Sequence, residues 1–289
     1  MPFDRATLEA AIEAFGGGKQ PDNQVEGLLA KLHVLEAAGR YGQLLNALAN
    51  ANDESNFRSL VLEATFAYQF EASGMALDYE VKQVPDQPSS IDFRLSATSG
   101  DSVFFEVRLL QQDRETADEV AAQLKANKQY AVVKDGRAEA DDIIRLQSTI
   151  LAKVQKPDGT PIKFLQAGPG FVNIVVVAIS DILLGTADTY DCVLATYGDS
   201  EVPEPCRRGM FGVFQDVKDA DPPDFQAAAA RFAHLKGNIY GVLFLFRPRG
   251  AGVLDYQLEM FIVWNRGLVS QESVTALEGQ IARALPAAG

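Results

Sequence analysis

The chain has 289 residues, 47% of them hydrophobic and 22% charged, and these average values exclude the disordered, fibrous and collagen-like classes. This length is enough to bury a large core without disulfides or structural metals. The formal net charge of −13 excludes attraction to DNA, RNA or anionic lipid through overall charge, so a polyanionic ligand needs a local positive patch.

The first third of the chain predicts helices followed by short strands. Residues 1–52 are rich in Ala and Leu at helical spacing, and they predict two or three short helices that form an N-terminal extension. The remainder, 53–289, is expected to form one α/β domain. It opens with capping residues at 52–55, which predict a helix that runs to about Glu71. Turn-forming residues then separate three predicted strands, at Leu77–Val84, Ile91–Leu95 and Val103–Leu110.

The rest of the chain alternates helices and strands. A polar stretch, Gln111–Gly136, is expected to be helical or mobile, and it leads to a helix at Asp141–Lys156. Phe171–Ser180 is so continuously apolar that it predicts a strand buried on both faces. After an irregular segment, Asp181–Pro223, we expect a helix, two strands and a last helix, at Phe225–Leu235, Ile239–Arg247, Tyr256–Trp264 and Gln271–Leu285. This order predicts a mixed sheet with helices on both faces.

Three acids and one amide occupy positions at which the hydrophobic pattern favours an apolar side chain. Glu63 and Gln147 project from the apolar faces of two predicted helices. Asp92 and Glu106 lie on neighbouring strands, each on the face opposite to large apolar residues. Departures of this kind from the hydrophobic pattern are typical of functional sites.

A turn centred on Gly100 would bring the charged faces of these two strands together. Asp92 would then lie opposite Arg108, and Arg94 opposite Glu106. The same residues therefore support two interpretations. One is a functional site, and the other is a self-neutralised cross-strand ladder in which each pair contributes about 0.2 to 1 kcal/mol.

At these residues the chain resembles the PD-(D/E)XK nuclease superfamily, which has the restriction-endonuclease-like fold. The core of that fold has the order predicted here, a helix, three strands, a helix and a strand, and the resemblance covers about residues 55–180. Glu63 resembles the helical acid of the superfamily, and Asp92 resembles its Asp on the second strand. The acid-x-Lys motif is matched by Glu106-Val107-Arg108, with Arg in place of Lys, and Gln147 resembles a helical Gln of some members.

The resemblance implies a phosphodiester hydrolase that depends on Mg²⁺ or Mn²⁺, with Glu63, Asp92, Glu106, Arg108 and Gln147 as its catalytic set. Asp92 and Glu106 would bind the ion and Glu63 would hold a water or a second ion, because Mg²⁺ prefers hard oxygen ligands. A lysine in this motif can approach neutrality and steer the nucleophilic water, whereas Arg108 stays charged and suits a phosphate clamp. We therefore expect weak or absent cleavage, and a gain in Arg108→Lys.

Two stretches carry a local excess of basic residues, and these are where a nucleic acid would bind: residues 125–163 and 225–254. Both DNA and RNA remain open as substrates. A second interpretation is a non-catalytic protein that keeps the nuclease-like fold and uses its acidic surface for a protein partner. A third is an unrelated α/β enzyme.

The sequence also bears on location and on other metals. Residues 1–5 lack the apolar core of a secretory signal, and the longest apolar stretches are too short to span a bilayer as helices. We therefore expect a cytoplasmic protein that does not insert into membranes. Cys192, Cys206, His33 and His234 provide too few plausible ligands for a zinc cluster.

Overall fold

The computed structural model describes most of the chain: residues 3–86, 89–110, 122–123, 126, 139–179, 188–201, 209–212, 223–248 and 250–288. The predicted polar stretch Gln111–Gly136 lies almost wholly outside these ranges, as do Cys206 and Arg249. Within them, no helix has the length and apolar character needed to cross a membrane.

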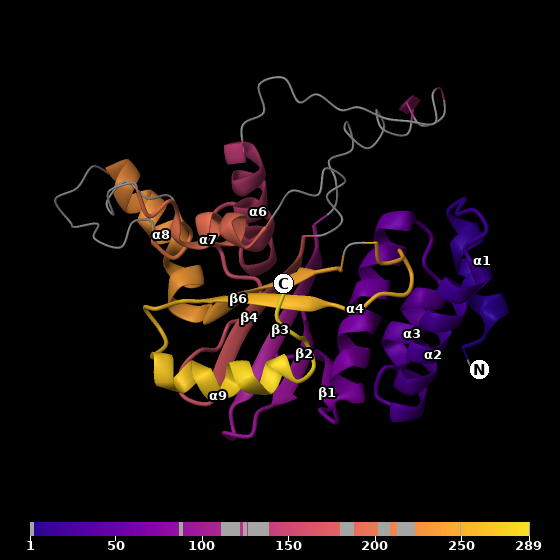
Figure 1. Cartoon of the computed structure of the whole chain (residues 1–289). Coiled ribbons are helices and arrows are strands. Elements are labelled where there is room, and N and C mark those ends of the chain that lie inside the picture. Colours follow the sequence, from indigo (N-terminus) through magenta and orange to yellow (C-terminus); the bar gives the residue numbers. More distant parts are fainter. Residues whose placement is uncertain are drawn as a thin grey trace.

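A six-stranded mixed sheet forms the centre of the molecule (Figure 1). Its strands lie side by side in chain order: β1 (Leu77–Val81), β2 (Ile91–Ser96), β3 (Ser102–Leu109), β4 (Phe171–Ala178), β5 (Gly241–Phe246) and β6 (Glu259–Trp264). The first three strands form an antiparallel meander, β3, β4 and β5 run parallel, and β6 returns antiparallel to β5. The predicted mixed sheet is therefore confirmed.

Helices pack on both faces of this sheet (Figure 1). One hydrophobic cluster includes side chains from α1 (Arg5–Ala14), α2 (Asp22–Ala38), α3 (Gly42–Ala49), α4 (Glu54–Ala72) and α9 (Gln271–Ala282). A second cluster, on the opposite face, includes side chains from α6 (Glu139–Val154), α7 (Thr189–Tyr197) and α8 (Pro223–Asn238). The N-terminal helices therefore share one core with the sheet.

Helix α4 packs on the sheet through aromatic contacts. Asp53 caps its N-terminus by accepting a hydrogen bond from the Asn56 amide at 2.7 Å. The rings of Phe66 and Phe70 pack on Phe105 of β3, with centroid distances of 5.5 and 5.7 Å. These contacts fix the rotation of α4 relative to the sheet, and with it the position of Glu63 on this helix.

Helix α2 is tied to the C-terminal half of the chain by a buried lysine. The Lys31 ammonium forms an ion pair with Asp255 at 2.8 Å and donates a hydrogen bond to the Tyr256 carbonyl. It also lies over the rings of Tyr68 and Tyr256, 5.8 and 5.5 Å from their centroids. The helical extension thus packs against residues that directly precede β6.

The predicted irregular segment 181–223 contains a helix, α7, in its described part. Asp188 caps this helix by accepting hydrogen bonds from the amides of Tyr190 and Asp191, while the Asp191 carboxylate accepts one from the Asp188 amide at 2.9 Å. The reciprocal pair is a capping box built with Asp instead of Ser and Glu. The expectation of an irregular segment was therefore wrong for α7, and Asp-x-x-Asp was the signal.

The hairpin between β2 and β3 turns one residue earlier than predicted. Ser96 pairs with Ser102, so the hairpin is centred on Ser99 rather than on Gly100. Gly100 has a left-handed φ of 92° and donates a hydrogen bond to the Ala97 carbonyl at 3.0 Å. Gly100 is therefore the last residue of a four-residue turn and not its centre. Glycine suits this place because it adopts a left-handed backbone at low cost.

This change of register removes the predicted cross-strand ladder. A shift of the turn by one residue moves every cross-strand partner by two, so Asp92 does not face Arg108, and Arg94 does not face Glu106. Arg94 forms its ion pair with Asp78 of β1 instead, at 2.5 Å. The register places Asp92 beside Glu106, and a self-neutralised ladder does not explain these two acids.

Candidate functional site

Charged side chains, two of them buried acids, gather where the first three strands meet the segment that leads into β4. We call this group the acid–lysine cluster, and its members are Glu63, Glu80, Asp92, Glu106, Lys153 and Lys163. Four carboxylates face two ammonium groups, an excess of two negative charges when all six groups are ionised. Such an excess in a partly buried place favours the binding of protons or of a cation.

Glu106 on β3 is fully buried, and its carboxylate is bound by two lysines. Lys153 of α6 donates to its Oε1 at 2.7 Å, and Lys163, from the segment between α6 and β4, donates to its Oε2 at 2.5 Å. The side chains of the two lysines are 24% and 14% exposed, against 0% for Glu106. A carboxylate shielded from solvent is costly unless it is paired, and the two lysines provide that pairing for Glu106.

Asp92 on β2 is also buried, and one of its oxygens replaces a partner in the β-ladder. Its Oδ2 accepts a hydrogen bond from the Val107 amide at 2.7 Å. Burial raises the pKa of Asp92 well above its usual range, and the negative charges of Glu106 and Glu63 raise it further. A proton or a cation nearby would therefore stabilise Asp92 in its buried position.

Glu63 enters the cluster from α4, on the other side of the sheet. It is half-buried and accepts a hydrogen bond from the Tyr79 hydroxyl at 3.0 Å. Burial raises the pKa of Glu63 to about 7, although the Tyr79 hydrogen bond and the charge of Lys153 oppose this rise. The charge of Glu63 consequently changes near neutral pH.

Lys153 stays charged in this environment. Burial disfavours its ammonium form, but the charges of Glu106 and Asp92 and the hydrogen bond to Glu106 outweigh that effect, so that the pKa of Lys153 is raised. The cluster therefore holds a permanent cation beside its two most buried acids.

Two of the predicted site residues have other surroundings. Arg108 is exposed at the end of β3, and its positive charge acts on Lys153 rather than pairing with an acid in the described part of the chain. The Gln147 amide donates to the Ala195 carbonyl of α7 at 2.9 Å, which links two helices. Ile144 of the same helix is 57% exposed, so it lies outside the inward face of α6.

Sequence reasoning missed the two lysines. Lys153 falls on a helix whose inward face is decided by packing, and Lys163 lies in a segment without regular structure. One signal was available, because both residues belong to the predicted basic stretch 125–163. Two lysines of that stretch therefore pair with a buried acid, and are not available only as an exposed surface for nucleic acid.

The donor set bears on the implied metal. Among the described residues, no three His, Cys, Asp or Glu side chains are arranged to hold an ion, so Glu63, Asp92 and Glu106 do not form a three-ligand site. Mg²⁺ is commonly bound through one or two carboxylates and several waters. Asp92 and Glu106 are the two carboxylates that could supply oxygen donors of this kind, and both oxygens of Glu106 are bound by lysines in this structure.

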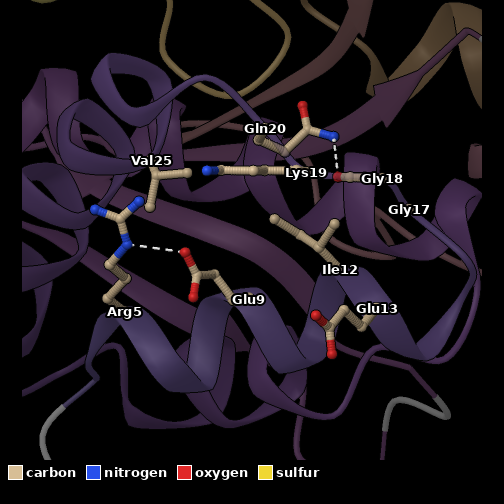
Figure 2. A pocket seen from close by; sticks show the side chains of 9 residues that line it. All are labelled: Arg5, Glu9, Ile12, Glu13, Gly17, Gly18, Lys19, Gln20 and Val25. Carbon is tan, nitrogen blue, oxygen red and sulfur yellow. Dashed lines mark hydrogen bonds and ion pairs between the residues drawn. The ribbon is translucent and has the colours of Figure 1, made fainter.

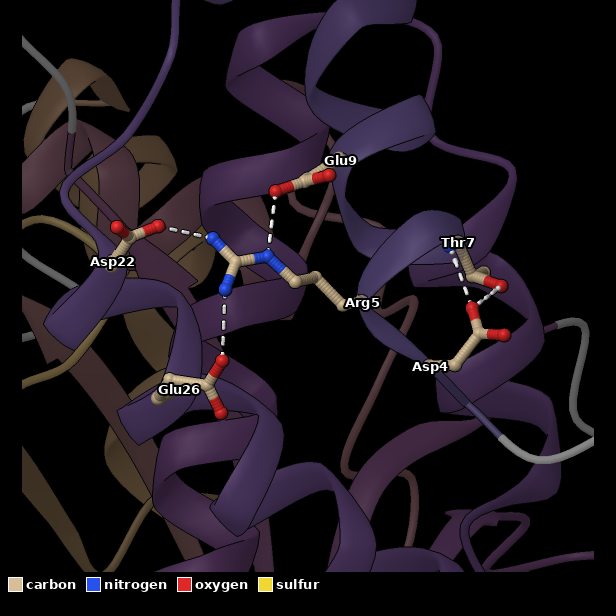
Figure 3. Close-up of polar contacts among 6 residues, drawn as sticks. All are labelled: Asp4, Arg5, Thr7, Glu9, Asp22 and Glu26. Atoms are coloured by element: carbon tan, nitrogen blue, oxygen red, sulfur yellow. Dashed lines mark hydrogen bonds and ion pairs between the residues drawn. The ribbon is translucent and has the colours of Figure 1, made fainter.

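A separate cleft of about 360 Å³ lies between α1 and the start of α2 (Figure 2). It is lined by Arg5, Glu9, Ile12, Glu13, Gly17, Gly18, Lys19, Gln20 and Val25. Arg5 points to three acids at once, Glu9, Asp22 and Glu26 (Figure 3). The positive charge of Arg5 is therefore already balanced by acids of this protein.

Comparison with known proteins gave no match. No protein-family model matches this sequence, and neither the curated proteins nor the solved structures yielded a match to the chain. The assignment of a function therefore depends on the chemistry of the acid–lysine cluster.

Proposed function

We propose that the acid–lysine cluster is the centre of a Mg²⁺-dependent phosphodiester hydrolase of the PD-(D/E)XK kind, on a restriction-endonuclease-like core. The observation that carries this proposal is the fully buried Glu106, which lies beside Asp92 and binds two lysines. A carboxylate at this position is costly, and a leucine would fit the hydrophobic pattern better. The presence of a carboxylate there is explained if the chemistry requires it.

The order of elements supports the proposal. Glu63, Asp92 and Glu106 come from α4, β2 and β3, and the next helix and strand, α6 and β4, follow in the order that the resemblance implies. Parallel pairing of β3 with β4 brings the segment after α6 next to Glu106, and this segment carries Lys163. Three parts of the motif and a lysine are thus neighbours.

Each residue has a role in this proposal. Asp92 and Glu106 would hold the Mg²⁺ ion, which when bound polarises a phosphate and lowers the pKa of a bound water. Lys153 and Lys163 would attract the phosphate and stabilise the negative charge that develops on it. Glu63, with its pKa near 7, is suited to accept a proton from a water close to neutral pH.

The lysine pair changes the expectation for Arg108. Lys163 brings an ammonium to Glu106 from outside the motif, and in this proposal it takes the place of the motif lysine that Arg108 replaces. We therefore expect cleavage by the natural protein, and no gain in Arg108→Lys. The exposed Arg108 is then a contact for the phosphate backbone rather than part of the chemistry.

The experiment combines calorimetry with Mn²⁺ and cleavage of plasmid DNA and single-stranded RNA in Mg²⁺ or Mn²⁺. Asp92→Asn and Glu106→Gln should lose both the binding heat and the cleavage. Asp78→Asn, which removes an acid of β1 that pairs with Arg94, is the matched control and should lose neither. Binding heat without cleavage of either polymer would refute the nuclease assignment.

The second function is a non-catalytic protein that binds a protein partner. One observation favours it: both oxygens of Glu106 already have a cationic partner, so the acid is satisfied without an ion. Under this proposal the cluster stabilises the fold only. Absence of both binding heat and cleavage in the natural protein would support it.

A further inference from the structure

The two lysines that bind Glu106 are attached to the fold in different ways. Lys153 lies in the last turn of α6, and 24% of its side chain is exposed. Lys163 lies in the segment between α6 and β4, and 14% of its side chain is exposed. Each ammonium binds one oxygen of the same carboxylate. The two cations therefore share one acid but differ in their attachment and in their access to water.

A histidine holds the backbone of Lys163. Nε2 of His234, on α8, lies 2.9 Å from the Lys163 carbonyl oxygen. The side-chain amide nitrogen of Asn238, one turn further along α8, lies 3.0 Å from the His234 carbonyl and 3.1 Å from His234 Nδ1. Because an amide nitrogen only donates, Nδ1 accepts this bond and Nε2 carries the proton that is donated to Lys163. The imidazole therefore fixes one end of the segment.

Amide side chains hold the same segment three residues further on. Asn173 of β4 is fully buried, and its Nδ2 donates to the Gln166 carbonyl at 2.8 Å. The Gln166 backbone amide donates to Gln83 Oε1 at 3.3 Å, and Gln83 Nε2 donates to Asn173 Oδ1 at 2.7 Å. Between these contacts lies Phe164, which is fully buried and has a left-handed φ of 55°. Lys163 therefore approaches Glu106 from a backbone that α8, β4 and the chain after β1 all hold.

Lys153 is less constrained than Lys163. Among the described residues, Glu106 is the one hydrogen-bond partner of its ammonium, which ends a flexible four-carbon chain. Rotation about the bonds of this chain carries the ammonium into water without any change in the helix backbone. Lys153 is therefore the lysine that can leave Glu106 at the lower cost.

We propose that Lys153 is the cation that leaves Glu106 when a divalent ion binds there, while Lys163 stays on Oε2. Two positive charges at one carboxylate oxygen repel each other at short range, so the Lys153 ammonium on Oε1 competes with an ion for that oxygen. The inference rests on the proposed function. It also explains how an acid whose two oxygens both have cationic partners can still serve an ion. Lys153 is then an internal competitor that weakens ion binding.

Calorimetry with Mn²⁺ tests the competition. Lys153→Met removes the competing charge and should bind Mn²⁺ about ten times more tightly than the natural protein. Lys156→Met is the matched control, because it removes a positive charge that is exposed three residues further along the chain. Salt and water screen such a charge, so its loss should change the affinity by about twofold at most. If Lys153→Met does not fold, Lys153→Gln removes the same charge and keeps a hydrogen-bond donor for Glu106. An unchanged affinity in the Lys153 variant would overturn the proposal.

A second measurement shows which lysine moves, because removal of either lysine takes a positive charge away from the ion. In ¹H–¹⁵N spectra of the lysine side chains, an ammonium bound to a buried carboxylate exchanges its protons slowly and gives a signal. Lys153→Met assigns the signal of Lys153. Addition of Mg²⁺ to saturation should remove this signal and leave that of Lys163. Loss of the Lys163 signal instead, or persistence of both signals, would overturn the proposal.

These measurements also separate this inference from the proposed function, since neither uses cleavage. Exchange of Lys153 without cleavage of DNA or RNA would refute the nuclease assignment and leave the inference intact. Binding of Mn²⁺ by Lys153→Met but not by the natural protein would support the inference as the case of a strong competitor. Absence of binding in both proteins would refute the ion site and the inference together.

Discussion

Two regions of this protein use carboxylates and cations in opposite ways. At the N-terminus, Arg5 contacts Glu9, Asp22 and Glu26, and all four side chains are between 38% and 70% exposed. In the acid–lysine cluster, Glu106 contacts two lysines with no exposure of its own. Both networks have one central charge with several partners, and they differ in access to water.

The comparison separates ion pairs that need no explanation from those that do. Water screens the Arg5 network and hydrates each member when a partner is lost, so such pairs contribute little to stability. A buried carboxylate cannot recover hydration, and the same contacts become a condition for folding. Burying the Glu106 carboxylate is costly, and this cost favours a functional role for the acid–lysine cluster.

The largest effect is expected when the buried acid loses both lysines. Lys153→Met combined with Lys163→Met leaves Glu106 without a cation, and the free energy of unfolding should fall by about 3 to 5 kcal/mol in urea denaturation. Adding Glu106→Leu to this double variant should restore most of the loss, because no charge then remains buried at this position. A loss as small as that at Arg5 would remove the distinction between the two regions.

A smaller effect is expected from the pH dependence at Glu63. Its pKa is raised from 4.5 to about 7, so between these values the folded protein binds a proton that the unfolded chain has released. Stability should therefore fall as pH rises through this window. Glu63→Gln should flatten that fall and raise the free energy of unfolding at about pH 8 by about 1 to 3 kcal/mol. A steeper fall in the variant would contradict this cause.

The smallest effect is expected at the exposed network. Arg5→Gln should change the thermal midpoint only slightly, and even this change should vanish in about 1 M NaCl, where surface charges are screened. The double lysine variant should keep its loss at the same salt concentration. A salt-resistant loss in Arg5→Gln would mean that exposure does not separate the two networks.

The periodicity of apolar residues predicted the sheet, its flanking helices and the order of elements, because burial decides these features locally. The acids were found for the same reason: Glu63, Asp92 and Glu106 each occupy a position at which the pattern favours an apolar side chain. Whether these residues act in catalysis stays a prediction. The restriction-endonuclease-like assignment, Mg²⁺ and the nucleic-acid partner also stay predictions.

The partners of these acids were not predictable from local pattern. The hairpin register depended on whether Gly100 formed the centre or the end of its turn, and one residue of error reassigned every pair. Lys163 reaches Glu106 from a segment without a periodic signal, directly before Phe164 with its left-handed backbone. Such contacts join distant segments, and tertiary packing decides them.

The backbone amide of Val107 donates its hydrogen bond to the Asp92 carboxylate instead of to a backbone carbonyl of a neighbouring strand. Asp92→Ala would leave that amide without its acceptor. A loss of activity in this variant could then come from local unfolding of β3 or from loss of the carboxylate, and the two causes would not be separated. Asp92→Asn retains an oxygen that can accept the bond while it removes the negative charge. Hydrogen exchange of the Val107 amide would then act as an internal gauge: protection shows an intact strand, and any lost activity can be assigned to charge alone.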